Sequence, residues 1–250
     1  MFDVVPGVVN IPDTDLIVPS IGIKGKSFLY TNEMYGAFMT IRNTGAILPA
    51  TTTRSQYAIK GPGTNDQYMQ IADDGSEASD FPQNRDQYEE MISLIQAPSV
   101  PGWYTLRGCA DYLNLANETN ETNNCTEIPF EVRQAYPDFI VSALSLREGT
   151  SIKKNTRVHP YCTVQNIGNG APPRSILIAY YINSGVFRDN DTVEASEIGP
   201  GQSRTENVNN DNIKLGDKGN RTYTCCVDYQ GQVAESNEGN NCATIGFKVK

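Results

Sequence analysis

The sequence predicts an all-β protein made of two tandem immunoglobulin-like antiparallel β-sandwich domains, and three observations support this prediction. A segment of 17 residues that begins and ends with cysteine occurs twice, at 109–125 and 226–242, with 9 identical positions. Short runs of alternating apolar residues are separated by turns rich in Gly, Pro and Asn, which is typical of β-strands. The six cysteines divide unevenly, two in the first copy and four in the second, but each copy has an even number and can pair its own.

The repeat also sets the domain boundaries. Residues 15–18 and 40–45 match 138–141 and 163–168 at an offset of 123 residues, whereas the cysteine segments are offset by 117. The first copy therefore carries six extra residues in its middle. Each copy is long enough for about seven short strands. We expect an N-terminal arm at 1–14, a first domain at 15–133 and a second domain at 134–250.

Strands are predicted wherever apolar residues alternate, as in 38–42 of the first copy and 175–182 of the second. One segment, 86–95, has apolar spacing that also suits a helix. Its counterpart at about 203–213 is polar and shows no helical period. Strand and loop are therefore predicted for this segment in both copies.

The repeated segment predicts one loop-closing disulfide in each domain. Cys109 pairs with Cys125, and Cys226 pairs with Cys242, at the two ends of the segment. Each bond closes a loop of about 15 residues, which on the loop-entropy model stabilises the fold by roughly 3 kcal/mol.

The two remaining cysteines, Cys162 and Cys225, predict a bridge between the sheets of the second domain. Cys225 directly precedes Cys226, so on a strand one side chain enters the core while the other faces the turn. The Tyr-x-Cys spacing before Cys225 and the separation of 63 residues are typical of an immunoglobulin-like bridge. The equivalent positions of the first domain are Met39 and Gly108, so both partners are absent together.

Zinc bound by thiolates is the rival interpretation of the cysteines. No C-x2-C knuckle occurs, and His159 is the single histidine, so disulfides are favoured over zinc. Stable disulfides indicate an oxidising compartment, and we expect an extracellular or cell-surface location. The chain lacks the basic and apolar regions of an export signal, which leaves this expectation unchanged.

Charge and motifs exclude several classes of function. The net charge of −9 without a Lys/Arg cluster disfavours nucleic acid as a partner, and no apolar stretch is long enough for a membrane span. His159 has no G-x-S-x-G turn to accompany it, and no phosphate-binding loop occurs. A catalytic pair of carboxylates of the glycosidase kind is not excluded, since a sequence does not show the distance between two side chains. We predict that the protein is not an enzyme.

The repeated motifs resemble those of the CARDB family, cell-adhesion-related modules of bacterial and archaeal surface proteins. The resemblance lies in an opening Pro-Asp-Leu-like strand, a Val-x-Asn-x-Gly turn, a Tyr-Tyr strand followed by an acidic loop, and a closing Glu-x-Asn-Glu-x-Asn-Asn-Cys. It covers both copies, although residues 60–86 replace the acidic loop in the first. The resemblance implies a seven-stranded sandwich that serves as a spacer or adhesion module and has no catalysis of its own. These motifs occupy residues 137–141, 164–168, 180–182, 188–191 and 226–242, and in the first copy 14–18, 41–45 and 109–125.

Calcium is the one cofactor for which the sequence offers candidate ligands. Asp189 and Asp191 place alternate oxygen ligands on one short predicted turn, although the Gly and the distal Glu of an EF-hand are missing. The Glu-x-Asn-Glu-x-Asn-Asn segments also carry oxygen ligands, but Asn side chains build turns by bonding the backbone, and this structural interpretation is favoured. The carboxylates concerned are Glu118, Glu121, Glu235 and Glu238.

Two features of the sequence bear on carbohydrate, an aromatic residue and a set of sequons. Trp103 follows a Pro-Gly pair at the start of a strand, where a core or corner aromatic is favoured over a sugar-binding platform. Five Asn-x-Ser/Thr sequons would carry glycans if the source glycosylates its proteins. They begin at Asn117, Asn120, Asn124, Asn190 and Asn220.

The N-terminal arm is apolar. It has no free counterpart before the second copy, because the residues there already form the last strand of the first copy. We expect it to pair with a sheet edge, and Pro6 restricts it to an edge or bulged pairing. Pairing within its own first domain is favoured because of the higher effective concentration, and strand addition to the next molecule is the alternative. The assembly residues are Phe2, Val4, Val5, Val8, Val9 and Ile11.

Taken as a whole, the sequence predicts a non-enzymatic extracellular structural or adhesion module of a cell-surface or secreted protein, with protein partners or self-assembly. One alternative is a subunit of an extracellular filament joined by strand addition. Another is a calcium-dependent or carbohydrate-binding module attached to a secreted enzyme.

Overall fold

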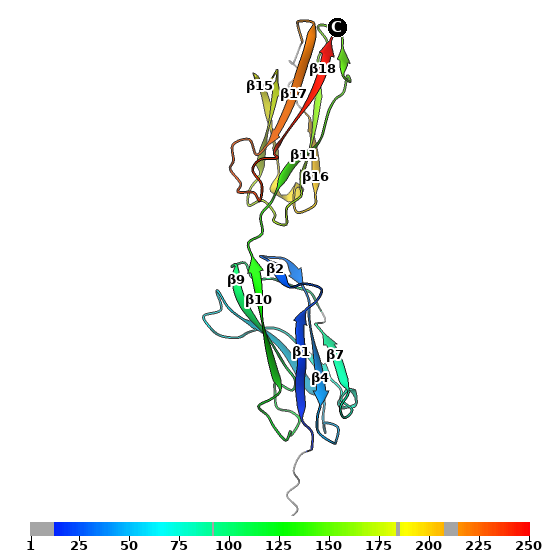
Figure 1. The fold of residues 1–250 in the computed structure, drawn as a ribbon, viewed down its shortest axis with the longest axis vertical. Helices are drawn as coiled ribbons and strands as arrows, with labels where there is room; N and C mark the ends of the chain where they lie inside the picture. Colours follow the sequence, from blue (N-terminus) through cyan, green and yellow to red (C-terminus); the bar gives the residue numbers. More distant parts are fainter. Residues whose placement is uncertain (1–12, 92, 184–185, 208–214) are drawn as a thin grey trace, which may run out of the picture. The chain divides into compact units, whose positions relative to one another are not determined.

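The computed structural model describes residues 13–91, 93–183, 186–207 and 215–250 (Figure 1). The chain divides into two compact units, one up to Gln134 and one from Ala135. Both are built almost entirely of strands, so the prediction of an all-β fold with two tandem sandwiches is confirmed. The six assembly residues of the arm, Phe2 to Ile11, lie outside the described residues.

The first unit is a sandwich of a three-stranded and a five-stranded sheet, in the orders β1-β4-β7 and β2-β10-β9-β5-β6. A short ribbon joins β3 to β8, and one 3-10 turn spans Ala78–Asp80. The strands are β1 (Leu16–Ile23), β2 (Phe28–Tyr30), β3 (Met34–Tyr35), β4 (Ala37–Asn43), β5 (Thr53–Lys60), β6 (Met69–Ser76), β7 (Asp86–Glu90), β8 (Ile95–Gln96), β9 (Gly102–Cys109) and β10 (Cys125–Arg133).

The second unit repeats this topology, with sheets in the orders β11-β13-β16 and β12-β18-β17-β14-β15. Its 3-10 turn spans Ala195–Glu197. The strands are β11 (Phe139–Leu146), β12 (Ser151–Ile152), β13 (Pro160–Asn166), β14 (Ile176–Ile182), β15 (Val186–Val193), β16 (Ser203–Asn207), β17 (Gly219–Val227) and β18 (Cys242–Val249). All pairings between the named strands are antiparallel except β2 with β10 and β12 with β18.

Alternation along the central strands explains how each core forms. Strand β4 alternates strictly between buried and half-buried residues, and β13 does the same, because successive side chains of a strand point to opposite faces. Met39 and Ile41 thus enter the first core, and Cys162 and Val164 enter the second. No helix among the described residues is long and apolar enough to cross a membrane.

The segment with ambiguous spacing is strand and loop, as predicted. Strand β7 pairs with β4 and places Tyr88 opposite Thr40, and the second-copy counterpart β16 pairs with β13. Sheet pairing along these edges therefore outweighs the local helical spacing of the apolar residues.

The structure contains the three predicted disulfides. Cys109–Cys125 and Cys226–Cys242 each join directly opposed positions of an antiparallel strand pair, with Cα atoms 4.1 Å apart. Cys162–Cys225 connects β13 to β17 across the sandwich, with Cα atoms 6.4 Å apart. Both of these last cysteines are fully buried, so the bond is part of the second core.

The first domain fills the position of this bridge in another way. Met39 is fully buried, and its sulfur and methyl carbon lie 3.4 Å from the point where a Cβ on Gly108 would stand. The Cδ1 atom of Ile21 would lie only 2.6 Å from that Cβ. A thioether and an isoleucine therefore occupy the space that the second domain gives to a disulfide.

Candidate functional site

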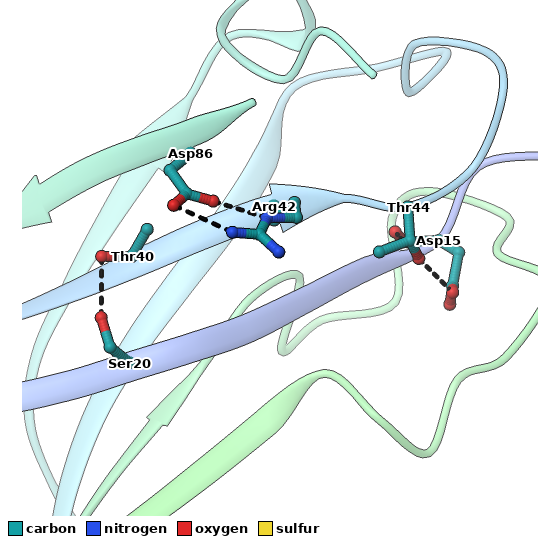
Figure 2. Close-up of polar contacts among 6 residues, drawn as sticks. All are labelled: Asp15, Ser20, Thr40, Arg42, Thr44 and Asp86. Carbon is teal, nitrogen blue, oxygen red and sulfur yellow. Dashed lines mark hydrogen bonds and ion pairs between the residues drawn. The ribbon is translucent and has the colours of Figure 1, made fainter. Parts of the chain in front are cut away.

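Polar side chains form a ladder on the outer face of the three-stranded sheet of the first domain. Figure 2 shows Ser20 donating to Thr40 across β1 and β4 at 2.9 Å. Arg42 binds both oxygens of Asp86 at 2.6 and 3.0 Å, which ties β4 to β7. All four side chains are exposed to solvent to some degree, and their mutual contacts stabilise strand pairing modestly.

One asparagine in each domain, Asn43 and Asn166, organises the turn after the central strand. Both are fully buried, and each uses its amide fully. The Asn166 oxygen accepts from the N–H groups of Asp138 at 3.1 Å and Gly168 at 3.0 Å. Its nitrogen donates to the carbonyls of Gly170 at 2.9 Å and Ile198 at 3.0 Å. A buried amide with all four hydrogen bonds made is a structural device and has no free atom for a ligand.

The glycine two residues later in this motif is required by close backbone approach. A Cβ at Gly45 would lie 2.0 Å from the carbonyl oxygen of Asp13, and one at Gly168 would lie 2.5 Å from the carbonyl oxygen of Tyr136. The Val-x-Asn-x-Gly pattern therefore joins the start of each domain to the turn after its central strand.

A glutamate in each domain, buried in the first and half-buried in the second, ties the loop before the last strand to the first strand. In the first domain the Glu118 carboxylate accepts from the Leu16 N–H and from the Asn124 amide, the latter at 2.7 Å. Asn123 donates to Asp15 at 3.0 Å. We call this set of contacts the loop latch.

The second domain repeats the loop latch with equivalent residues. Glu235 accepts from the Phe139 N–H and from the Asn241 amide, each at 2.5 Å. Asn240 donates to Asp138 at 2.7 Å. The structural interpretation of the Glu-x-Asn-Glu-x-Asn-Asn segment is thereby supported, since its side chains bond the chain itself.

Burial raises the pKa of both glutamates of the loop latch. The pKa of Glu118 is raised from its ordinary 4.5 to about 7, chiefly because burial penalises the charged form. The pKa of Glu235 is raised to about 7 for the same reason. The donated hydrogen bonds oppose the rise in both cases without cancelling it.

Asp111 and Asp228, two residues after the first cysteine of the repeated segment, have a structural role that the sequence patterns above did not predict. Asp111 accepts from the Leu115 and Ala116 N–H groups at 3.0 and 2.7 Å, and Asp228 binds the corresponding turn through Val233 at 2.9 Å. Both residues have positive φ angles, 41° and 42°. Asp occurs at this position in both copies, and this repetition could have predicted the role, because Asp caps turns and tolerates a positive φ.

The predicted turn that carries Asp189 and Asp191 is absent, and this prediction is wrong. Both residues lie within β15, opposite Tyr180 and Ile178 of β14. Extension of the hairpin through this segment makes it a strand, and each carboxylate accepts from the N–H of its own successor, at 2.9 and 2.8 Å. Within the described residues, no cluster of three His, Cys, Asp or Glu side chains has a geometry that could hold a metal.

Two other predictions about surface residues are corrected. Trp103 is 66% exposed on β9, so it is not a core aromatic; its neighbour Tyr104 takes the inward position of the alternation. Asn124 is 5% exposed and donates to Glu118, so its amide is not available to a glycan. The other four sequon asparagines are exposed: Asn117, Asn120, Asn190 and Asn220.

The fold and these contacts define a protein of two immunoglobulin-like sandwiches whose repeated motifs hold loops to strands. The CARDB family model matches residues 136–245, the second domain. No curated protein matches the chain.

Solved structures of two archaeal domains are similar to parts of the chain. A CARDB domain from Pyrococcus furiosus, crystallised in complex with di-metal ions, is 26% identical, with 46% of this chain and 94% of that chain covered and a TM-score of 0.37. A domain of a putative cell surface protein from Methanosarcina acetivorans is 23% identical, with 46% and 93% covered and a TM-score of 0.37.

Proposed function

We propose that the protein is a non-enzymatic structural or adhesion module of a cell-surface or secreted protein, with the first domain as a diverged second CARDB copy. CARDB is a family of modules related to cell adhesion. The observation that carries the proposal is the use of the repeated motif residues: Asn43, Asn166, Glu118 and Glu235 all bond the chain itself. Such residues maintain a rigid shape.

The disulfides support an extracellular location. Each domain has one bond that closes the loop between its last two long strands, and the second domain has a buried bridge as well. Bonds of this kind persist where glutathione does not reduce them, outside the cytosol.

The test uses the protein in cells of its source. Antibodies against the folded chain are expected to label intact cells or the medium, and non-reducing peptide mapping of the recovered protein is expected to find all three bonds. Free thiols at all six cysteines, or labelling confined to opened cells, would contradict the proposal.

A further inference from the structure

The two sandwiches differ in how well one side is covered. On this side the first strand of one sheet lies beside the last strand of the other. In the first domain these strands are β1 and β10, and in the second they are β11 and β18. We call this the lateral side of each domain. No described strand pairs with β11 beyond β13, and β12 covers β18 only at Lys248 and Val249.

The lateral side of the first domain is closed. Pro19 interrupts β1 at a bulge, and Pro129 removes a donor from the outer edge of β10. The Thr126 hydroxyl donates to the Val18 carbonyl and so bridges the two sheets. Val18 and Ile21 are buried beneath this contact, at 3% and 7% exposed.

The second domain keeps the bulge in its first strand, between Val141 and Ala143, but it lacks both prolines and the threonine. Its equivalents of Pro19 and Pro129 are Ser142 and Gly246, and Ala243 stands where Thr126 would supply the hydroxyl. The consequence appears in the core, since Val141 and Leu144, the counterparts of Val18 and Ile21, are only partly buried. Ile245 of β18 is also partly buried, as its counterpart Ile128 is in the first domain.

The disulfide gives a physical reason for the exposure of Leu144. In the first domain Ile21 leans over Gly108 so closely that no Cβ fits there, with a gap of 2.6 Å. The second domain has Cys225 at that position, bonded to Cys162. The bridge therefore excludes Leu144 from the space that Ile21 occupies, and apolar surface is left on the lateral side.

The edge of β18 presents backbone donors to this side. Lys248 and Lys250 donate their N–H groups to Thr150 and Ile152, both at 2.8 Å. Because N–H directions alternate along a strand, the N–H groups of Gly246 and Thr244 face the same way.

Three other edge strands, β6, β7 and β16, carry charges, which protect sheet edges from pairing with a further strand. Strand β6 has Asp73 and Asp74, β7 has Asp86 and two glutamates, and β16 has Arg204 and Glu206. Strand β11 and residues 242–247 of β18 contain neither a charged residue nor a proline.

We infer that the lateral side of the second domain, between β11 and β18, is a docking site for an extended apolar strand, namely residues 2–11 of another copy of this chain. That segment reads FDVVPGVVNI and contains one charge. Ten extended residues span roughly 33 Å, enough to follow an edge of five residues, which needs about 17 Å. Strand addition of this kind combines backbone hydrogen bonds with side-chain burial, here of Val141, Leu144 and Ile245.

Pairing between copies follows from the closed lateral side of the first domain. Asp13 and Thr14, which follow the arm, are held in the first domain through Ile47 and Thr119, at 3.2 and 2.8 Å. The equivalent lateral side of its own first domain carries Pro129. Head-to-tail contacts of this kind need not close and so build a filament. This inference goes beyond the structural role proposed above, which a monomer would fulfil equally well.

The experiment compares two substitutions at one position of the full chain. Gly246→Pro removes the edge N–H, and Gly246→Ala keeps it; the Cβ that both substitutions add has no other atom within 4 Å. We expect assembly by light scattering and electron microscopy to survive Gly246→Ala. Association is expected to weaken at least about ten-fold in Gly246→Pro through the lost hydrogen bond and the ring's steric clash.

A cross-link identifies the occupant even if Gly246→Pro fails to fold. A photoreactive amino acid replaces Val8 in the full chain, and normal and ¹⁵N-labelled copies are mixed before irradiation. We expect mixed-isotope cross-links from the arm to peptides of β11 or β18. A chain that stays monomeric at millimolar concentration, equal assembly of the two Gly246 variants, or cross-links within single copies only would each overturn the inference. None of these outcomes would affect the surface location or the disulfides.

Discussion

Glu118 is a buried acid and Glu235 a half-buried one, and the fold retains both for their hydrogen bonds. Glu118 holds the Leu16 N–H and the Asn124 amide, although desolvation opposes its charge. The contact is made twice, with Glu235 in the second domain. This repetition indicates that fixing the loop latch outweighs the cost of burying a carboxylate.

The first prediction concerns the pH dependence of stability. Glu118 has a folded-state pKa of about 7 against 4.5 when unperturbed, so between these values the folded state binds more protons than the unfolded state. Stability is therefore expected to rise as pH falls from about 7 towards 4.5, and to be lowest above 7. The expected gain is on the order of 2 kcal/mol, measured by urea unfolding at several pH values.

The control for this prediction is Glu118→Gln, which cannot ionise and is expected to flatten the pH profile of the first domain. Asn124 can rotate its amide to accept from the new one, because its oxygen makes no hydrogen bond within the described residues. An unchanged profile in this variant would mean that Glu118 does not titrate in this range.

The second prediction concerns Gly108, where a methyl group meets Ile21. Gly108→Ala is expected to lower the free energy of unfolding of the first domain by about 1–3 kcal/mol, since the core is overpacked. Gly246→Ala is the matched control, because its methyl group enters open space. Chemical denaturation measures both, and equal stability of the two variants would show that Ile21 simply moves aside.

At the scale of strands, the disulfides differ in accessibility. Cys125 and Cys242 are exposed at the starts of β10 and β18, whereas Cys162 and Cys225 are fully buried. Thiol exchange requires access of the attacking thiolate to sulfur. The bonds at strand ends and the bond in the core should therefore behave differently towards reductant.

The third prediction follows from this difference. Mild reduction with alkylation is expected to label Cys125 and Cys242 well before Cys162 and Cys225, as measured by peptide mass mapping over time. Replacing the buried pair by alanine is expected to cost about 4 kcal/mol, since it closes the longer loop. Simultaneous labelling of all six would show that global unfolding precedes reduction.

At the scale of the whole molecule, each unit has its own core and its own disulfides. The two hydrophobic clusters share no residue, and the chain divides between Gln134 and Ala135. Units of this size with complete cores are able to fold alone.

The fourth prediction is that residues 13–134 and 135–250, expressed separately under oxidising conditions, each unfold in one cooperative transition. Their melting temperatures should lie within a few degrees of the two transitions of the full chain in calorimetry. If neither half folds, the two units depend on each other and the division into independent domains is wrong.

The sequence by itself determined the fold class, the repeat and the disulfides. Strand periodicity is local, and the spacing of Cys109, Cys125, Cys226 and Cys242 repeats in both copies, so neither needs knowledge of distant contacts. The paired loss at Met39 and Gly108 even located the bridge between the sheets.

The tertiary structure alone decided which residues are accessible and what they touch. Trp103 is exposed, Asn124 is buried, and Asp189 lies in a strand because sheet pairing and alternation outweigh the local turn signals. The partial exposure of the lateral side of the second domain was likewise decided by tertiary contacts. Its exposure arises where β11 and β18, which are far apart in the sequence, meet without the proline and threonine contacts of the first domain.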